Sequence, residues 1–213
     1  LFAVFPLAYS IIMPALYIPV IVMLLALIFR GVAFEFRWPA KPAHAAWDLA
    51  FWSGSTIAAF AQGLILGGLL QGITVRDGAF AGGPLDWLTP FTVLVGIAVV
   101  AGYALLGACW LIMKTEGGVA TRARGQARWL LLVVVVFAGI VSLWTPYQFP
   151  RIAAFWFSTP NIYYLWPFPV LTALLAFLVH RWLATDAEVA PFLGVIAMFV
   201  LCYLGLAISN FPY

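Results

Sequence analysis

Charged side chains are scarce in this sequence. Only 8% of its 213 residues are Asp, Glu, Lys or Arg, whereas a soluble domain carries roughly 25%. Seven acids and ten bases could not solvate the surface of a 23.3 kDa globule. The hydrophobic share of 66% also excludes an intrinsically disordered chain. The mean hydropathy of +1.10 favours an integral membrane protein.

Cysteine and histidine are equally sparse. Cys109 and Cys202 stand in separate apolar runs, which excludes a disulfide framework and zinc spacing, so we expect both to pack as small apolar residues. His44 and His180 fall near expected helix ends, and no CxxCH occurs. We therefore favour solvated, interfacial histidines over haem ligands, and we expect no metal site.

Recognised catalytic and binding motifs are missing as well. The sequence contains no P-loop, no GxSxG and no HExxH, so we identify no catalytic residue. The bases are not gathered into one stripe despite a net charge of +3. Nucleic acid is therefore not an expected partner.

Long apolar runs are what the sequence has in abundance. A helix needs about 20 apolar residues to cross the hydrocarbon core of a bilayer. Uninterrupted runs such as Leu130–Val136 favour helices over the alternating strands of a barrel. Expected spans are Ala8–Arg30, Ala45–Ile73, Pro90–Met113, Trp129–Tyr147, Pro167–Ala184 and Pro191–Ser209, after a helix remnant at Leu1–Phe5.

The fold class predicted by these runs is all-α. We expect a polytopic transmembrane helical bundle of about six full spans, forming a single domain over residues 1–213. The chain begins inside an apolar run without a start methionine and stops directly after another. We therefore expect it to be a fragment of a longer subunit, and we expect the lipid bilayer to be its surroundings.

Basic residues alternate between the connections. Eight of the ten lie in the first, third and fifth expected loops and their flanks: Arg30, Arg37, Lys41, Lys114, Arg122, Arg124, Arg128 and Arg181. The second and fourth loops hold only Arg76 and Arg151. The positive-inside rule then predicts that the first, third and fifth loops are cytoplasmic.

Aromatic residues indicate the surroundings of the fourth loop, and small residues indicate how the helices pack. The fourth loop, residues 148–169, is so aromatic that we expect it to lie along the outer interface or on a partner. A quinone-contacting surface is the alternative.

Ala59, Gly63 and Gly67 at four-residue spacing indicate close helix packing. Gln62 and Gln71 need hydrogen-bond partners.

Two stretches place charge near the membrane boundary. RGVAFEFR carries Arg30 and Glu35, and GACWLIMKTEGG carries Lys114 and Glu116. A carboxylate among apolar neighbours is costly unless it is paired or can take up a proton. Arg30 could pair with Glu116, or Lys114 with Glu35. Simple anchoring of helix ends is the alternative.

The same stretches carry a family resemblance. RGVAFEFR, Trp47–Asp48, LLQG at residues 69–72, GACWLIMKTEG and the terminal SNFPY occur in order along the chain. Together they resemble subunit II of the cytochrome bd-type quinol oxidases, including the cyanide-insensitive branch. The resemblance covers essentially the whole chain. The family's first helix, with its tryptophan-aspartate-glycine motif, would precede Leu1, and further sequence would follow Tyr213.

The resemblance implies a respiratory terminal oxidase in the prokaryotic inner membrane. Such a complex oxidises quinol, reduces dioxygen to water and builds a proton gradient. Its haems, b and d, would belong to the larger partner, subunit I, and this chain itself would bind none. Subunit II would scaffold that partner, contribute to proton uptake and in some members hold a lipid or quinone. The quinol pool and a small accessory subunit complete the implied partners.

Roles for individual residues follow only from the resemblance. It makes Glu35 a proton-relay candidate, with Arg30 holding it ionised or facing a haem propionate across the subunit boundary. It gives Lys114 and Glu116 a structural role as an ion-pairing signature. The alternative function is a small-solute transporter, for which Pro14 and Pro19 would break a helix. A transporter should show related halves, and we find no clear internal repeat.

Overall fold

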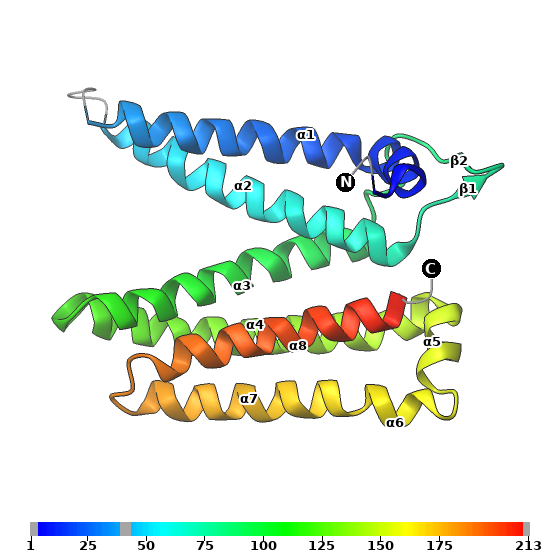
Figure 1. Ribbon diagram of the computed structural model, residues 1–213. Coiled ribbons are helices and arrows are strands. Elements are labelled where there is room, and N and C mark those ends of the chain that lie inside the picture. Colours follow the sequence, from blue (N-terminus) through cyan, green and yellow to red (C-terminus); the bar gives the residue numbers. More distant parts are fainter. Residues whose placement is uncertain (1–3, 39–43, 211–213) are drawn as a thin grey trace. The chain divides into compact units, whose positions relative to one another are not determined.

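The computed structural model describes residues 4–38 and 44–210. Its elements are α1 (Pro6–Phe36), α2 (His44–Gln71), β1 (Val75–Arg76), β2 (Ala79–Phe80), α3 (Pro90–Lys114), α4 (Gly117–Gln148), α5 (Pro150–Trp156), α6 (Asn161–Leu165), α7 (Pro167–Ala184) and α8 (Ala190–Asn210) (Figure 1). Among the described residues, six helical segments are long and apolar enough to cross a membrane. The chain is a polytopic, all-α membrane protein, as the apolar runs predicted.

The helix bounds correct the expected spans in two places. α1 continues to Phe36 rather than ending near Arg30, and α4 begins at Gly117 rather than at Trp129. Arg122, Arg124 and Arg128 therefore lie on a helix and not in a loop. Ala, Arg and Gln have high helix propensity, so a helix that leaves the hydrocarbon can continue into water. The expected remnant at residues 1–5 lies mostly outside the described residues.

The chain divides into two compact units, residues 1–100 and 101–213. In the first unit α1 and α2 lie side by side along most of their length (Figure 1). The first turns of α1 (dark blue) bend away from the rest of the helix in the same view. Pro14 and Pro19 lie inside α1, and a proline removes a backbone hydrogen bond and kinks a helix.

Glycines set how closely the helices of the first unit approach. A Cβ on Gly63 of α2 would lie 2.5 Å from the Cα of Gly96 on α3. A Cβ on Gly67, one turn later, would lie 2.8 Å from the Cα of Thr92. Both neighbours are backbone atoms, which cannot rotate aside as a side chain can. The expected small-residue packing face is therefore present, and it joins α2 to α3.

The connection from α2 to α3 is fastened by hydrogen bonds. Gln71 donates through Nε2 to the carbonyl of Asp86 at 3.2 Å, and its Oε1 accepts from the Thr89 hydroxyl at 2.8 Å. The buried Thr92 hydroxyl donates to the carbonyl of Trp87 at 2.7 Å. Between these points a hairpin pairs Val75 with Phe80. The hydrogen-bond partners that Gln71 was expected to need thus lie in the connection between α2 and α3.

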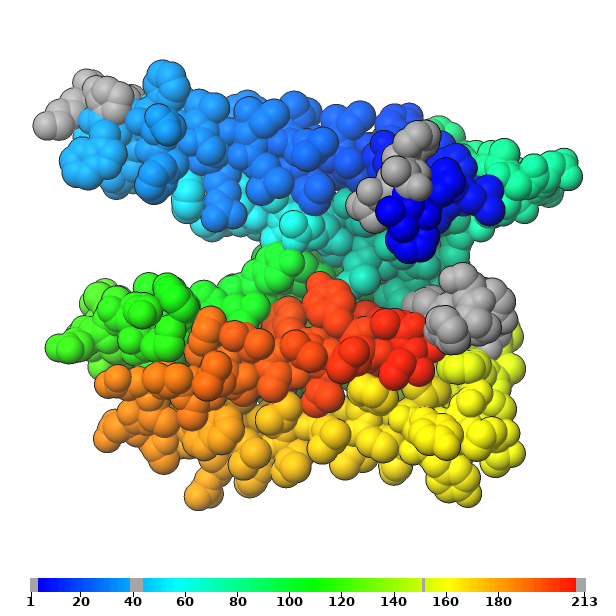
Figure 2. Space-filling view, in the orientation of Figure 1, coloured from blue at the N-terminus to red at the C-terminus, as the bar shows by residue number. Residues whose placement is uncertain are grey.

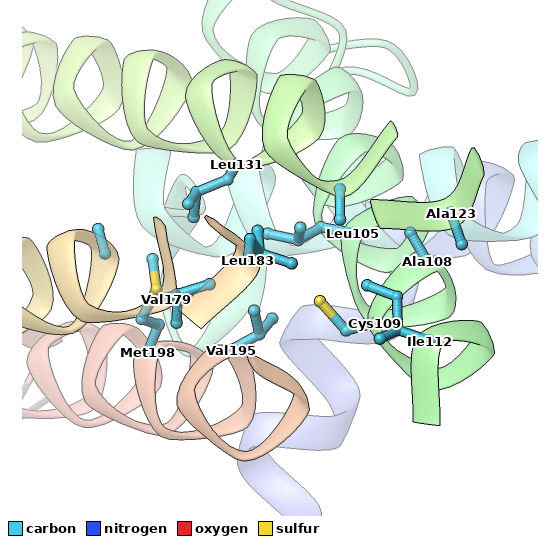
Figure 3. Packing of buried hydrophobic residues seen from close by; sticks show 12 residues of the cluster. Leu105, Ala108, Cys109, Ile112, Ala123, Leu131, Val179, Leu183, Val195 and Met198 are labelled. Carbon is cyan, nitrogen blue, oxygen red and sulfur yellow. The ribbon is translucent and has the colours of Figure 1, made fainter. Parts of the chain in front are cut away.

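The second unit has a compact apolar core (Figure 3). Its fully buried members include Leu105 and Cys109 of α3, Ala127 of α4, Leu183 of α7 and Val195 of α8. Cys109 packs as a small apolar residue, as expected. Cys202 is exposed on α8, so the same expectation is wrong for that residue.

Large apolar side chains also remain on the outside. Leu24, Ile28 and Phe29 of α1 each expose half or more of their surface. Figure 2 shows the side chains of α1 (blue) forming an open face along the helix. Such faces suit lipid or a partner helix, because neither requires a polar surface.

The contact at Gly63 yields a stability prediction. Gly63→Ala should lower the free energy of unfolding in detergent by roughly 1–3 kcal/mol, because overpacking forces the backbones apart. Gly31→Ala on α1 is the matched control, since nothing lies within 4 Å of a Cβ there. Thermal unfolding of the two purified variants measures the difference. Equal stability would show that the α2–α3 approach is loose.

Candidate functional site: charged groups at the helix ends

The end of α1 carries the first pair of predicted site residues. Arg30 lies over the ring of Phe51 on α2, with its guanidinium carbon 5.5 Å from the ring centroid. A Cβ on Gly54 would lie 2.8 Å from the carbonyl oxygen of Ala26 and 3.2 Å from the backbone nitrogen of Arg30. Arg30 therefore sits where α1 and α2 approach closely, and its charge faces an aromatic ring.

Glu35 lies in the last turn of α1 and is exposed. Its neighbours Phe34 and Phe36 are exposed as well, Phe34 by 72%. Glu35 follows Arg30 by five positions, so the two side chains leave the helix in directions about 140° apart around its axis. The structure does not bring these two side chains together. Glu35 is instead a carboxylate on an open, aromatic helix end.

An ion pair lies next to Glu35. Arg37 donates two hydrogen bonds to the carboxylate of Asp48. Its Nε donates to Oδ1, and its Nη2 donates to Oδ2 at 3.3 Å. Hydrogen bonding to Asp48 raises the pKa of the Arg37 guanidinium. Phe36 stacks on Trp47 with ring centroids 5.5 Å apart. Phe36, the last residue of α1, and Arg37, its C-cap, thus meet two successive residues of α2, which fixes the register of the helix pair.

Sequence reasoning missed this ion pair, although both partners stood in the quoted motifs. Arg37 ends RGVAFEFR, and Asp48 follows Trp47 in the tryptophan-aspartate dipeptide. Opposite charges at the facing ends of two consecutive helices were the available signal. Arg37 was interpreted only as a loop charge.

The junction of α3 and α4 carries the second pair. Lys114 ends α3, and its Nζ lies 5.1 Å from the ring centroid of Trp110. Glu116 is the exposed N-cap residue of α4, in an extended conformation, and Gly117 follows with φ +64°. A negative charge at a helix N-terminus is favourable. Lys114 and Glu116 thus bracket a sharp turn.

The pairing of these two stretches with each other stays a prediction. Arg30 and Glu35 belong to the first compact unit, and Lys114 and Glu116 to the second. In the described part of its own unit, neither Arg30 nor Lys114 has a carboxylate within ion-pair distance. Each cation lies over an aromatic ring instead.

Two further arginines, expected only as loop charges, hold the end of α7. Arg124 donates from Nη1 to the carbonyls of Thr185 and Ala187, the latter at 3.2 Å. Arg128 donates to the carbonyl of Leu183 from Nη2 at 2.7 Å and from Nε at 3.2 Å. The last carbonyls of a helix lack intrahelical partners. Arg128 supplies donors for one such carbonyl, and Arg124 supplies donors for two carbonyls of the connection that follows α7.

Neither histidine lies among the residues that line the apolar pocket of the first unit. His44 begins α2, and His180 is exposed on α7. An open apolar pocket of about 310 Å³ lies between α2 and α3, lined by Thr56, Ile57, Phe60, Ile97 and Val100, none of which ligates iron. His44 precedes that pocket by twelve residues, or about 18 Å of helix. Among the described residues, no group of three or more His, Cys, Asp or Glu could hold a metal ion.

The chain is similar to bacterial respiratory oxidase subunits. It is 29% identical over 154 residues to the cytochrome bd-I ubiquinol oxidase subunit 2 of Escherichia coli K12, covering 69% of this chain and 41% of that protein. It is 31% identical over 153 residues to the cytochrome bd ubiquinol oxidase subunit 2 of Bacillus subtilis, covering 70% of this chain and 45% of the relative. The matches thus span less than half of each relative. Nothing in them supports the transporter alternative.

The whole chain also matches a family model. Residues 1–213 match the one described as cytochrome bd terminal oxidase subunit II. The match includes both charged stretches, the Trp47–Asp48 dipeptide and all six apolar helices described above. This chain therefore belongs to the cytochrome bd terminal oxidase subunit II family.

Proposed function

We propose that this chain works within a membrane quinol oxidase as part of its second subunit. The complex would oxidise quinol, reduce dioxygen to water and build a proton gradient across the prokaryotic inner membrane. The observation that carries the proposal is the family match over residues 1–213, which includes six apolar helices. Subunit I would be the partner, and the quinol pool the source of electrons.

The proposed division of labour places haem b and haem d in subunit I. The helix-end position of His44 and the exposed position of His180 support it, since neither lies in the apolar pocket. This chain would supply helical scaffold. Its exposed apolar faces, such as the one on α1, suit packing against a partner or lipid. A small accessory subunit, or a bound quinone or lipid, would use the same kind of surface.

Glu35 is the proposed proton-relay group. Its exposed position in the last turn of α1 makes it accessible. The neighbouring Arg37 pairs with Asp48 and not with Glu35, which leaves the Glu35 carboxylate available for the proposed role. The predicted cytoplasmic side of this helix end is the side from which protons would be taken up.

Arg30 is proposed to act on the haem environment rather than on Glu35. Its guanidinium lies over Phe51 and has no carboxylate within ion-pair distance in the described part of its unit. A cation held by an aromatic ring keeps donors for an anion such as a propionate. Lys114 and Glu116 are proposed to have a structural role at the α3–α4 turn.

The haem assignment can be tested on material purified from native membranes. A haem-containing polypeptide should accompany the full-length subunit, and quinol-dependent oxygen consumption should accompany both. After the subunits are separated, the Soret absorption should follow the partner. A stoichiometric, ligated haem on this chain would overturn the division of labour. A preparation with neither haem nor oxidase activity would overturn the proposed function.

Replacing Glu35 tests the proton relay. Glu35→Gln should lower quinol-dependent oxygen consumption by about tenfold or more, because proton transfer by a positioned side chain commonly contributes ~10²-fold or more. Glu188→Gln is the matched control, since Glu188 is an exposed acid in the α7–α8 connection. Normal turnover and normal proton uptake in a fully assembled Glu35→Gln complex would rule the relay out.

Replacing Arg30 separates a haem contact from anchoring. Arg30→Ala should shift the partner's haem absorption spectrum, and Arg30→Lys should restore much of it because the positive charge returns. Arg76→Ala in the hairpin serves as the control for the loss of one surface arginine. An Arg30→Ala complex with an unaltered spectrum would leave simple anchoring as the role of this residue.

A further inference from the structure

We propose that the outer face of α4 binds the headgroup of an anionic phospholipid, at a seat formed by Arg122, Gly125 and Arg128. This end of the second unit is where α3 and α7 end and where α4 and α8 begin (Figure 1). The inference does not depend on the proposed oxidase function.

The buried and exposed residues of α4 lie on opposite sides of the helix. Ala123, Ala127 and Leu131 are buried at four-residue spacing. Arg122, Trp129 and Val136 are exposed at seven-residue spacing, which returns to nearly the same side because a helix turns about 100° per residue. Leu143 and Tyr147 extend the exposed side. We call these exposed residues the α4 stripe.

The α4 stripe has the length of a membrane crossing. Trp129 is 71% exposed and Tyr147 is 89% exposed. Eighteen residues separate them, or about 27 Å of helix, close to the ~30 Å of the hydrocarbon core. Exposed Trp and Tyr at that separation mark the two interfaces. Arg122 and Arg128 then lie on the headgroup side of Trp129.

Gly125 forms a notch between the two arginines. It lies three residues after Arg122 and three before Arg128, so it falls midway between them both along the axis and around it. Nothing lies within 4 Å of a Cβ built on Gly125. An anionic group can therefore reach the helix surface there, between the backbone positions of Arg122 and Arg128.

Arg128 is held in place for this role. Its Nε and Nη2 donate to the carbonyl of Leu183, which leaves Nη1 with donors for a phosphate oxygen. Carbonyl bonds do not neutralise the guanidinium charge. Arg124 likewise donates hydrogen bonds to the carbonyls of Thr185 and Ala187 and keeps its positive charge.

Charge balance at this end favours an anion. The five bases are Lys114, Arg122, Arg124, Arg128 and Arg181, and the three acids are Glu116, Asp186 and Glu188. Within the described part of the unit, none of these acids forms an ion pair with a base. Clustered Arg and Lys beside a membrane helix attract acidic lipids.

The apolar part of the stripe identifies the ligand as a lipid rather than a free anion. Val136 and Leu143 of the stripe are each half exposed or more, as is Leu132 on the same side of α4. They continue from Trp129 toward Tyr147. Two acyl chains below a phosphate would cover this surface. Guanidinium groups bind phosphate oxygens through strong, charge-assisted hydrogen bonds. A diacyl phosphate ester matches both parts of the site.

The test uses the full-length subunit purified from membranes together with whatever assembles with it. The preparation is stripped of lipid in detergent and titrated with phosphatidylglycerol, and bound lipid is counted by native mass spectrometry. Arg122→Gln should weaken binding about fivefold, as expected for one basic residue at a lipid surface. Gly125→Leu should weaken it further by filling the notch. Arg76→Gln, which removes an arginine from the hairpin, should bind as the unaltered protein does.

Several outcomes would overturn the proposal. They are equal retention of phosphatidylcholine, equal affinity of Arg122→Gln and Arg76→Gln, and displacement of the lipid by inorganic phosphate alone. A photoreactive side chain at position 132 adds an independent measurement. It should cross-link to lipid in vesicles that contain phosphatidylglycerol, whereas an adduct with another polypeptide would show that a partner covers the stripe.

Discussion

Close approach of helix backbones is the constraint on which this structure depends. Lipid is as apolar as leucine, so expelling water cannot drive two membrane helices together. Packing contacts must do so, and they strengthen as the backbones approach. At Gly63 the neighbouring atom is the Cα of Gly96, and at Gly54 it is the carbonyl of Ala26. The positions of Arg30, on α1, and of the connection after α2 both follow from these contacts.

Several charged side chains near the helix ends find partners of different kinds. Arg37 pairs with Asp48, and Arg30 lies over Phe51. Arg128 binds a carbonyl in the last turn of α7, and Arg124 binds two carbonyls of the connection that follows this helix. The bases from which the membrane orientation is predicted are thus also structural groups. A residue such as Arg128 cannot be assigned to topology alone, because its removal would leave the carbonyl of Leu183 without these hydrogen bonds.

The apolar helices could be predicted from the sequence because about 20 apolar residues have few other stable arrangements in a bilayer. The bounds of α7 agree with the prediction, and its proline-marked start explains why. α1 and α4 could not be bounded this way. Hydropathy reports where the hydrocarbon ends, whereas helix propensity decides where the helix ends. The Arg37–Asp48 pair also escaped prediction, since it depends on the register of two helices and not on either segment alone.

The exposure of Glu35 determines which surroundings its proposed role as a proton relay would need. A carboxylate in water releases its proton readily, and only burial or a nearby charge makes it hold one near neutral pH. Within this chain Glu35 is exposed beside Phe34 and Phe36. The apolar surroundings that would tune it as a relay must therefore come from lipid or from a partner surface laid against these rings. On this argument the proton-relay site proposed at Glu35 would be completed by assembly, and this chain supplies the carboxylate and its position at the end of α1.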